Sequence, residues 1–88
     1  MDNIENIVDD SKIREYASQI DRIPIETRNQ MDKLFSDDKS ADFYHGLLTG
    51  FAYSHSLLHE DNPESPALQS IVTYMTYLAD KILKRTVH

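Results

Sequence analysis

The chain has no cysteine, and this absence excludes several kinds of site. Disulfides, thiolate metal centres and cysteine nucleophiles cannot form, so a small domain must be stabilised by packing alone. No apolar run approaches the roughly 20 residues that span a bilayer. The first residues show neither the basic region nor the apolar region of a secretory signal. We therefore expect a protein of the cytoplasm that does not associate with membranes.

Basic residues are scarce as well. The chain has 9 lysines and arginines against 15 aspartates and glutamates, which gives a net charge of −6. Residues 1–64 hold 14 of the acids and 6 of the bases, whereas residues 65–88 hold one acid and three bases. Because proteins bind phosphate backbones through lysine and arginine, this balance disfavours direct binding to nucleic acid. An acidic chain can instead mimic nucleic acid and occupy a basic groove on another protein.

Signals for β-structure and for common catalytic motifs are missing. Glycine occurs at two positions only, and the chain has no Asn-Gly or Asp-Gly hairpin signal, nucleophile elbow or phosphate-binding loop. What the 88 residues do show is apolar side chains at helical spacing, with 40% hydrophobic and 27% charged residues. These features predict one all-α domain over residues 1–88, a non-enzymatic function and no cofactor.

Caps and prolines divide the chain into helices. We expect a short helix at 2–8 and longer helices at 11–22, 24–35, 40–60 and from residue 66 onward. The break near residues 9–11 would make residues 1–10 an N-terminal arm or a clasp on a neighbour. Short connections between helices favour antiparallel neighbours. The predicted architecture is a small antiparallel bundle of three main helices plus one or two N-terminal helical segments.

Apolar stripes predict which faces are buried. In the first long helix the stripe contains Ile13, Tyr16, Ala17, Ile20 and Ile23. In the next helix Met31, Leu34 and Phe35 should point inward. The helix at 40–60 is expected to bury Phe43, Leu47, Phe51 and Leu58, flanked by Tyr44, Leu48 and Leu57. The last helix has the longest stripe, made of Leu68, Ile71, Val72, Met75, Leu78, Ala79, Ile82 and Leu83.

Three small residues recur four positions apart in the helix at 40–60. They are Gly46, Gly50 and Ser54. A glycine inside a helix costs about 1 kcal/mol relative to alanine, so two in one helix indicate close packing against this backbone. The neighbour is either another helix of the fold or a second chain, and we expect a homodimer.

A second face of the last helix carries tyrosines and cations. Its members are Tyr74, Tyr77, Lys81, Lys84 and Arg85. Tyrosine and arginine are enriched at protein interfaces, so this face is a candidate surface for an acidic or phosphorylated partner. The competing interpretation is that the tyrosines pack under another helix and the cations interact with the helix dipole.

Histidines offer two further hypotheses. His55 and His59 lie one turn apart, a spacing that can hold a metal, although a zinc site needs at least one more ligand. The segment at 45–50, His-Gly-Leu-Leu-Thr-Gly, resembles the helix of histidine phosphotransfer domains, which implies a phosphoryl-accepting His45. It lacks the lysine that precedes the glycine in that family, and its glycine is displaced by one position.

The function predicted from the sequence is binding to another protein. A small acidic helical unit would act as an inhibitor, adaptor or regulator of a larger partner, in the manner of antagonists on phages and other mobile elements. The alternatives are a bundle like those of bacteriocin-immunity proteins, a metal-binding or phosphoryl-accepting histidine protein, and the nucleic-acid mimic.

Overall fold

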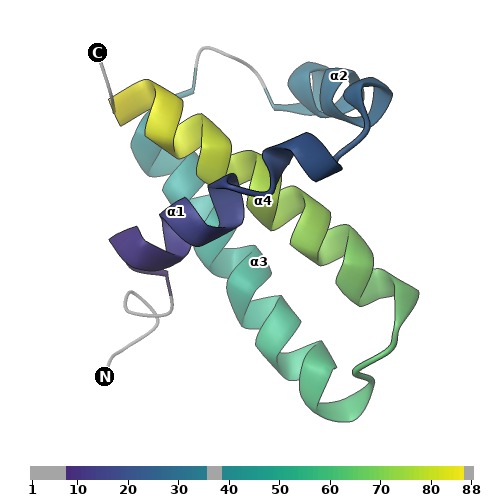
Figure 1. Ribbon diagram of the computed structural model, residues 1–88. Coiled ribbons are helices and arrows are strands. Elements are labelled where there is room, and N and C mark those ends of the chain that lie inside the picture. Colours follow the sequence, from purple (N-terminus) through teal and green to yellow (C-terminus); the bar gives the residue numbers. More distant parts are fainter. Residues whose placement is uncertain (1–7, 36–38, 87–88) are drawn as a thin grey trace.

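A computed structural model describes residues 8–35 and 39–86, and within them the protein is all-α, as predicted. Its elements are α1 (Asp10–Ala17), the 3-10 turn η2 (Ile20–Arg22), α2 (Ile25–Leu34), α3 (Ala41–Asp61) and α4 (Pro66–Thr86) (Figure 1). The predicted helix at 2–8 lies outside the described residues except for Val8, which is buried and not helical.

The two long helices form an antiparallel pair whose ends are set by caps. The Ser40 hydroxyl accepts a hydrogen bond from the Phe43 N–H at 3.2 Å and starts α3. The Ser65 hydroxyl accepts one from the Ala67 N–H at 3.1 Å, and Pro66 occupies the first helical position of α4. Both helices therefore begin within one residue of the predicted positions.

Helix α4 lies at the centre of the fold and packs against both α3 and α1 (Figure 1). The Cα atoms extend over 37 × 33 × 20 Å. The predicted stripe on α4 is buried or partly buried along its whole length. Between residues 75 and 79 every residue of α4 is buried, including Thr76 and Tyr77.

The prediction of one continuous helix at 11–22 is wrong. Helix α1 ends at Ala17, where the Ser18 hydroxyl donates a hydrogen bond to the Glu15 carbonyl at 2.7 Å. Such local bonds compete with continued α-helix, and the chain turns before η2. After this turn Ile23 is buried and Ile20 packs against the core.

Helix α2 contributes less to the core than expected. Met31 is buried and Phe35 is half-buried, but Leu34 is 68% exposed, so its predicted inward position is wrong. Ile25 is exposed too. Helix α2 therefore packs against the other helices through few apolar side chains.

Helix α3 is rotated relative to the predicted stripe. Tyr44, Leu48 and Ala52 are its buried residues, whereas Phe43 is 43% exposed and Leu57 is 51% exposed. Leu47 and Phe51 of the predicted stripe are partly buried against the core, so the prediction holds for them in part. One residue in a helix corresponds to a rotation of about 100°, which is the shift from Phe43 to Tyr44 as the buried residue. Both sides of α3 are apolar, so periodicity alone does not select the buried side.

Candidate functional site

The tyrosines predicted to be exposed on α4 pack beneath other helices. Tyr77 is only 4% exposed, so its predicted place on an exposed docking face is wrong. Tyr74 is half-buried, with its ring stacked on Phe51 of α3 at a centroid distance of 5.2 Å. Phe35, directly after α2, contacts both rings, at 6.0 Å from Tyr74 and 5.8 Å from Tyr77. The four rings join α2, α3 and α4.

The lysines of the same face have acidic neighbours. Lys81 lies with its Nζ 3.3 Å from Oδ1 of Asp32 and 5.4 Å from the centre of the Tyr77 ring. Lys84 forms an ion pair with Asp80, one turn earlier on α4, at 2.8 Å. The side chain of Arg85 lies outside the described part of the chain. A partner-binding role for the lysines stays a prediction.

Asp32 of α2 makes polar contacts with two residues of α4, Tyr77 and Lys81. It accepts a hydrogen bond from the Tyr77 hydroxyl. This bond, together with the nearby Lys81, holds the pKa of the Asp32 carboxyl below its usual value of 3.8, although partial burial opposes the shift. Burial of the Tyr77 hydroxyl, and its bond to the carboxylate, raise the tyrosine pKa. Both shifts favour a neutral tyrosine that donates to an ionised aspartate.

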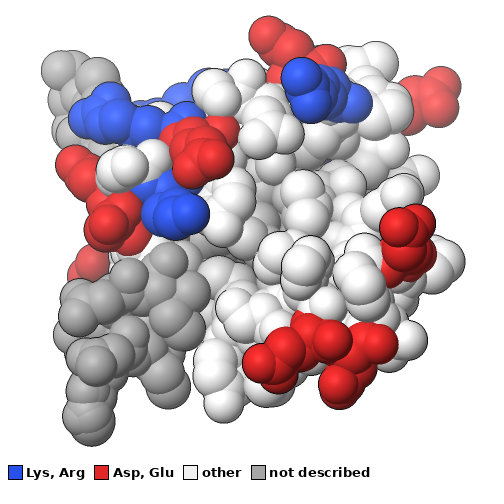
Figure 2. Space-filling model, turned by 60° about the horizontal axis from the view of Figure 1, so that its bottom comes forward, with Lys and Arg blue, Asp and Glu red and all other residues white. Residues whose placement is uncertain are grey.

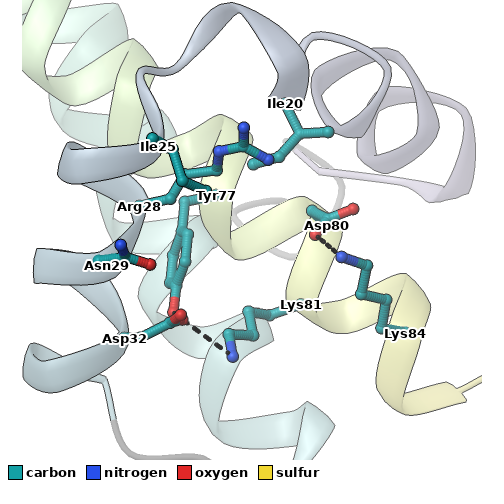
Figure 3. Close-up of a pocket in the computed structure, with 9 residues that line it drawn as sticks. All are labelled: Ile20, Ile25, Arg28, Asn29, Asp32, Tyr77, Asp80, Lys81 and Lys84. Atoms are coloured by element: carbon teal, nitrogen blue, oxygen red, sulfur yellow. Dashed lines mark hydrogen bonds and ion pairs between the residues drawn. The ribbon is translucent and has the colours of Figure 1, made fainter.

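A cavity of about 170 Å³ opens beside this contact, between α2, η2 and α4 (Figure 3). We call it the α2–α4 cavity. Arg28 extends from α2 over Tyr77 toward Ile20, and Asn29 lies below it on the same helix (Figure 3). Sequence reasoning did not single out Arg28 or Asp32, because nothing in their spacing indicates that α2 and α4 would bring them together with Lys81.

The second candidate region is the side of α3 that faces away from the core, which we call the α3 outer face. Its exposed apolar side chains include Phe43, Tyr53 and Leu57. A groove of about 290 Å³ runs along it, lined by Gly46, Leu47, Gly50, Phe51 and Ser54. Helical geometry places all these residues on one side of α3.

Among the described residues nothing packs closely against Gly46 and Gly50. A Cβ atom at Gly46 or at Gly50 would meet no atom within 4 Å. The predicted close approach to this backbone is therefore not made by another helix of the described fold. The second-chain alternative stays a prediction.

Charge is missing from the same region. From Phe43 to Leu58 the sequence has no aspartate, glutamate, lysine or arginine, a signal that sequence reasoning could have used. Turned by 60° so that its bottom comes forward, the molecule shows charged side chains gathered toward the edges of the view and an uncharged expanse between them (Figure 2). Yet none of the described helices is long and apolar enough to cross a bilayer.

In the described part of the chain, the histidines are not accompanied by enough ligands for a metal site. The rings of His55 and His59 lie 5.5 Å apart at the edge of a groove with Leu68 and Val72. Among the described residues no third histidine, aspartate or glutamate joins them in a group that could hold a metal. His45 is half-buried and lies in another groove, between α1 and α3. The metal and phosphoryl hypotheses stay untested.

Comparison of the chain with models of protein families, with curated proteins and with solved structures gave no match.

Proposed function

We propose that the chain is a non-enzymatic protein-binding module that works as a homodimer assembled through the α3 outer face. The observation that carries the proposal is that α3 has two apolar sides. One side packs in the core through Tyr44, Leu48 and Ala52, and the other exposes Phe43, the groove and Leu57. Contiguous apolar surface on a small protein marks interaction sites.

The shape of this face favours a second copy as its occupant. Gly46, Gly50 and Ser54 form a groove along one row of residues four apart, and Leu47 and Phe51 form the adjacent ridge. Two helices whose ridges of this kind fit each other's grooves cross at about −50°. A two-fold axis near Gly50 lets the ridge of each copy enter the groove of the other. The surface is therefore complementary to itself.

The distribution of charge also favours a second copy of the chain as the partner on the α3 outer face. Each chain has a net charge of −6, so two copies repel each other over most of their surfaces. The uncharged stretch of α3 brings no acid opposite an acid, and a steep crossing keeps the acidic helix ends, Asp42 and Glu60, apart.

The proposed role of the dimer is to bind a larger protein as an inhibitor, adaptor or regulator. Two identical acidic surfaces would then be presented to the partner together. The negative charge supports a basic surface on that partner, because complementary potentials speed association.

The test is the mass of the particle in solution for the wild type and for Gly50→Leu. Sedimentation equilibrium should give twice the chain mass of 10.2 kDa for the wild type. Gly50→Leu should give the monomer mass, because its side chain fills the groove. The fold should survive, since a Cβ at this position meets no atom within 4 Å.

The matched control is Gln30→Leu, which adds the same side chain to an exposed position of α2. This variant should remain dimeric. A second disruptive variant, Leu57→Glu, should also be monomeric because it puts a charged carboxylate on the apolar α3 outer face that the second copy would cover. A monomeric wild type, or a dimer that tolerates both disruptive changes with circular dichroism unaltered, would overturn the proposal.

A further inference from the structure

Helix α2 lies at the edge of the fold and contributes few apolar groups to it (Figure 1). Met31 is buried in the core, and Phe35, directly after the helix, packs against the core. The other two large apolar side chains of the helix, Ile25 and Leu34, are exposed. A helix with so little buried apolar surface separates from its neighbours more easily than the helices of the core. Its attachment depends mainly on a short stretch at its C-terminal end.

Within this stretch one carboxylate makes polar contacts with α4. Asp32 accepts a hydrogen bond from the Tyr77 hydroxyl, and Nζ of Lys81 lies 3.3 Å from the same oxygen, Oδ1. Figure 3 shows the Tyr77 side chain extending from α4 to Asp32, with Lys81 reaching the carboxylate from the next turn of α4. The Phe35 ring packs on the Tyr77 ring at a centroid distance of 5.8 Å. This part of α4 therefore holds a carboxylate and, three residues later, an aromatic ring.

Charge and exposure make this contact replaceable. Residues 65–88 hold one acid and three bases, so a carboxylate is attracted here although the whole chain has a net charge of −6. The acid of this segment, Asp80, is paired with Lys84 at 2.8 Å. The Asp32 side chain is 48% exposed, so solvent reaches the ion pair with Lys81. Another carboxylate can approach the same lysine and compete with Asp32.

We propose that α2 is an autoinhibitory helix whose release uncovers a docking surface on α4 for a helix of another protein. The surface consists of Tyr74, Tyr77 and Lys81. Helix α2 shows which chemistry fits it: an apolar side chain, a carboxylate directly after it, and an aromatic side chain three residues later. Amphipathic helices bind grooves through anchors at such spacings. The tyrosines of α4 then meet a partner only after α2 has moved away.

The covalent connection between α2 and α4 sets the strength of the competition. Because both helices belong to one chain, the effective concentration of α2 at this surface is on the order of millimolar. A competing helix binds only the open molecules, so its observed affinity falls with the fraction that is open. A change that loosens α2 raises this fraction and tightens the binding of the competitor. This dependence distinguishes displacement of α2 from binding to a surface that is already uncovered.

The experiment uses a synthetic peptide with the sequence of residues 24–35, capped at both ends, as the competing helix. It is added to the full chain, and backbone NMR resonances of α4 around Tyr77 are followed. In the full chain, Asp32→Lys puts a cation against Lys81 and should loosen α2. The peptide should then bind saturably and at least about tenfold more tightly than to the wild type.

The matched control is Glu26→Lys, the same change of charge at an exposed position of α2. This variant should bind the peptide no better than the wild type. Met31→Ala is a second way to loosen α2 without changing the charge, and it should tighten peptide binding as Asp32→Lys does.

A second set of measurements changes the peptide and leaves the full chain as it is. Asp32→Asn in the peptide should weaken its binding to the loosened chain at least about fivefold, whereas Glu26→Gln should not. Equal binding by the wild type and both loosened chains would overturn the proposal, as would equal binding of peptides with and without the carboxylate. Shifts confined to α1 or α3 would also exclude it. The same results are expected in Gly50→Leu, so they do not depend on the dimer.

Discussion

At the scale of single residues, the contact between Tyr77 and Asp32 links a buried hydroxyl to a carboxylate that is half exposed. The two residues are 45 positions apart, and the bond fixes α2 against α4. Burial of the hydroxyl and its bond to Asp32 raise the pKa of Tyr77. A tyrosine whose pKa is raised on folding stabilises the fold below its usual value of 10.0, and this contribution is lost at higher pH.

The first prediction is the stability of a variant that lacks the Tyr77 hydroxyl. Tyr77→Phe should lower the free energy of unfolding by about 1 kcal/mol near neutral pH, a figure reduced because solvent reaches Asp32. The Asp32 pKa is lowered in the folded state, so the charged form contributes stability above about pH 4 and loses it as pH falls. In urea denaturation, wild type and variant should converge from about pH 5 to about pH 2. A difference that is constant over this range would contradict the assignment.

The sequence predicted the buried residues correctly where a helix has one apolar face, and it failed to do so where a helix has two. The stripe on α4 was predicted correctly, because polar residues occupy much of its opposite side. On α3 the choice between Phe43 and Tyr44 as the buried residue depends on the shape of α4, which no local pattern contains. The place of Arg28 in the cavity beside Tyr77 depends on the packing of α2, so it too could not be predicted.

At the scale of elements, α2 is the helix with the weakest attachment. It buries Met31, and Phe35 directly after it is half-buried, while Ile25 and Leu34 are exposed. A helix with so few apolar contacts opens at a lower free energy than the core that it covers. We therefore expect α2 to detach while α3 and α4 stay packed.

Met31→Ala should make this detachment measurable. The substitution removes the buried side chain of α2, so amide hydrogens of this helix should exchange at least about tenfold faster. The slowest amides of α4 should keep their protection. Leu34→Ala is the matched control, because Leu34 lies three residues on in the same helix and is exposed. Equal acceleration in α2 and α4 after Met31→Ala would mean that the helices open together.

The sequence predicted where helices start better than whether each helix continues without a break. Proline and serine caps give α2, α3 and α4 their starts within one residue, because these signals act locally. The end of α1 at Ala17 was missed. The Ser18 hydroxyl bonds to the Glu15 carbonyl at this end, but hydroxyl-bearing residues make similar bonds within intact helices, as Thr49 and Thr73 do here, so the residue type gave no signal.

At the scale of the whole molecule, net charge opposes the proposed dimer and apolar packing favours it. Repulsion between two chains of charge −6 is screened by salt. The dissociation constant of the dimer should therefore fall about tenfold between about 20 mM and about 500 mM sodium chloride, measured by sedimentation. Weaker association at high salt would indicate an interface held by ion pairs, which would exclude the α3 outer face.

The all-α class could be predicted from the sequence because almost every segment has helical spacing and its own caps. How α1 and α2 lie across the α3–α4 pair could not, because their orientation is decided by contacts between distant residues such as Asp32 and Tyr77.

The central place of α4 has a consequence for how the protein is made. Helix α1 packs mainly on α4, and α3 buries its inner side on the same helix, yet α4 is the last of them in chain order. A ribosome releases the chain from its N-terminus at about 5–20 residues per second. The apolar sides of α1 and α3 therefore stay exposed until α4 has left the exit tunnel. The core can form only after that late step.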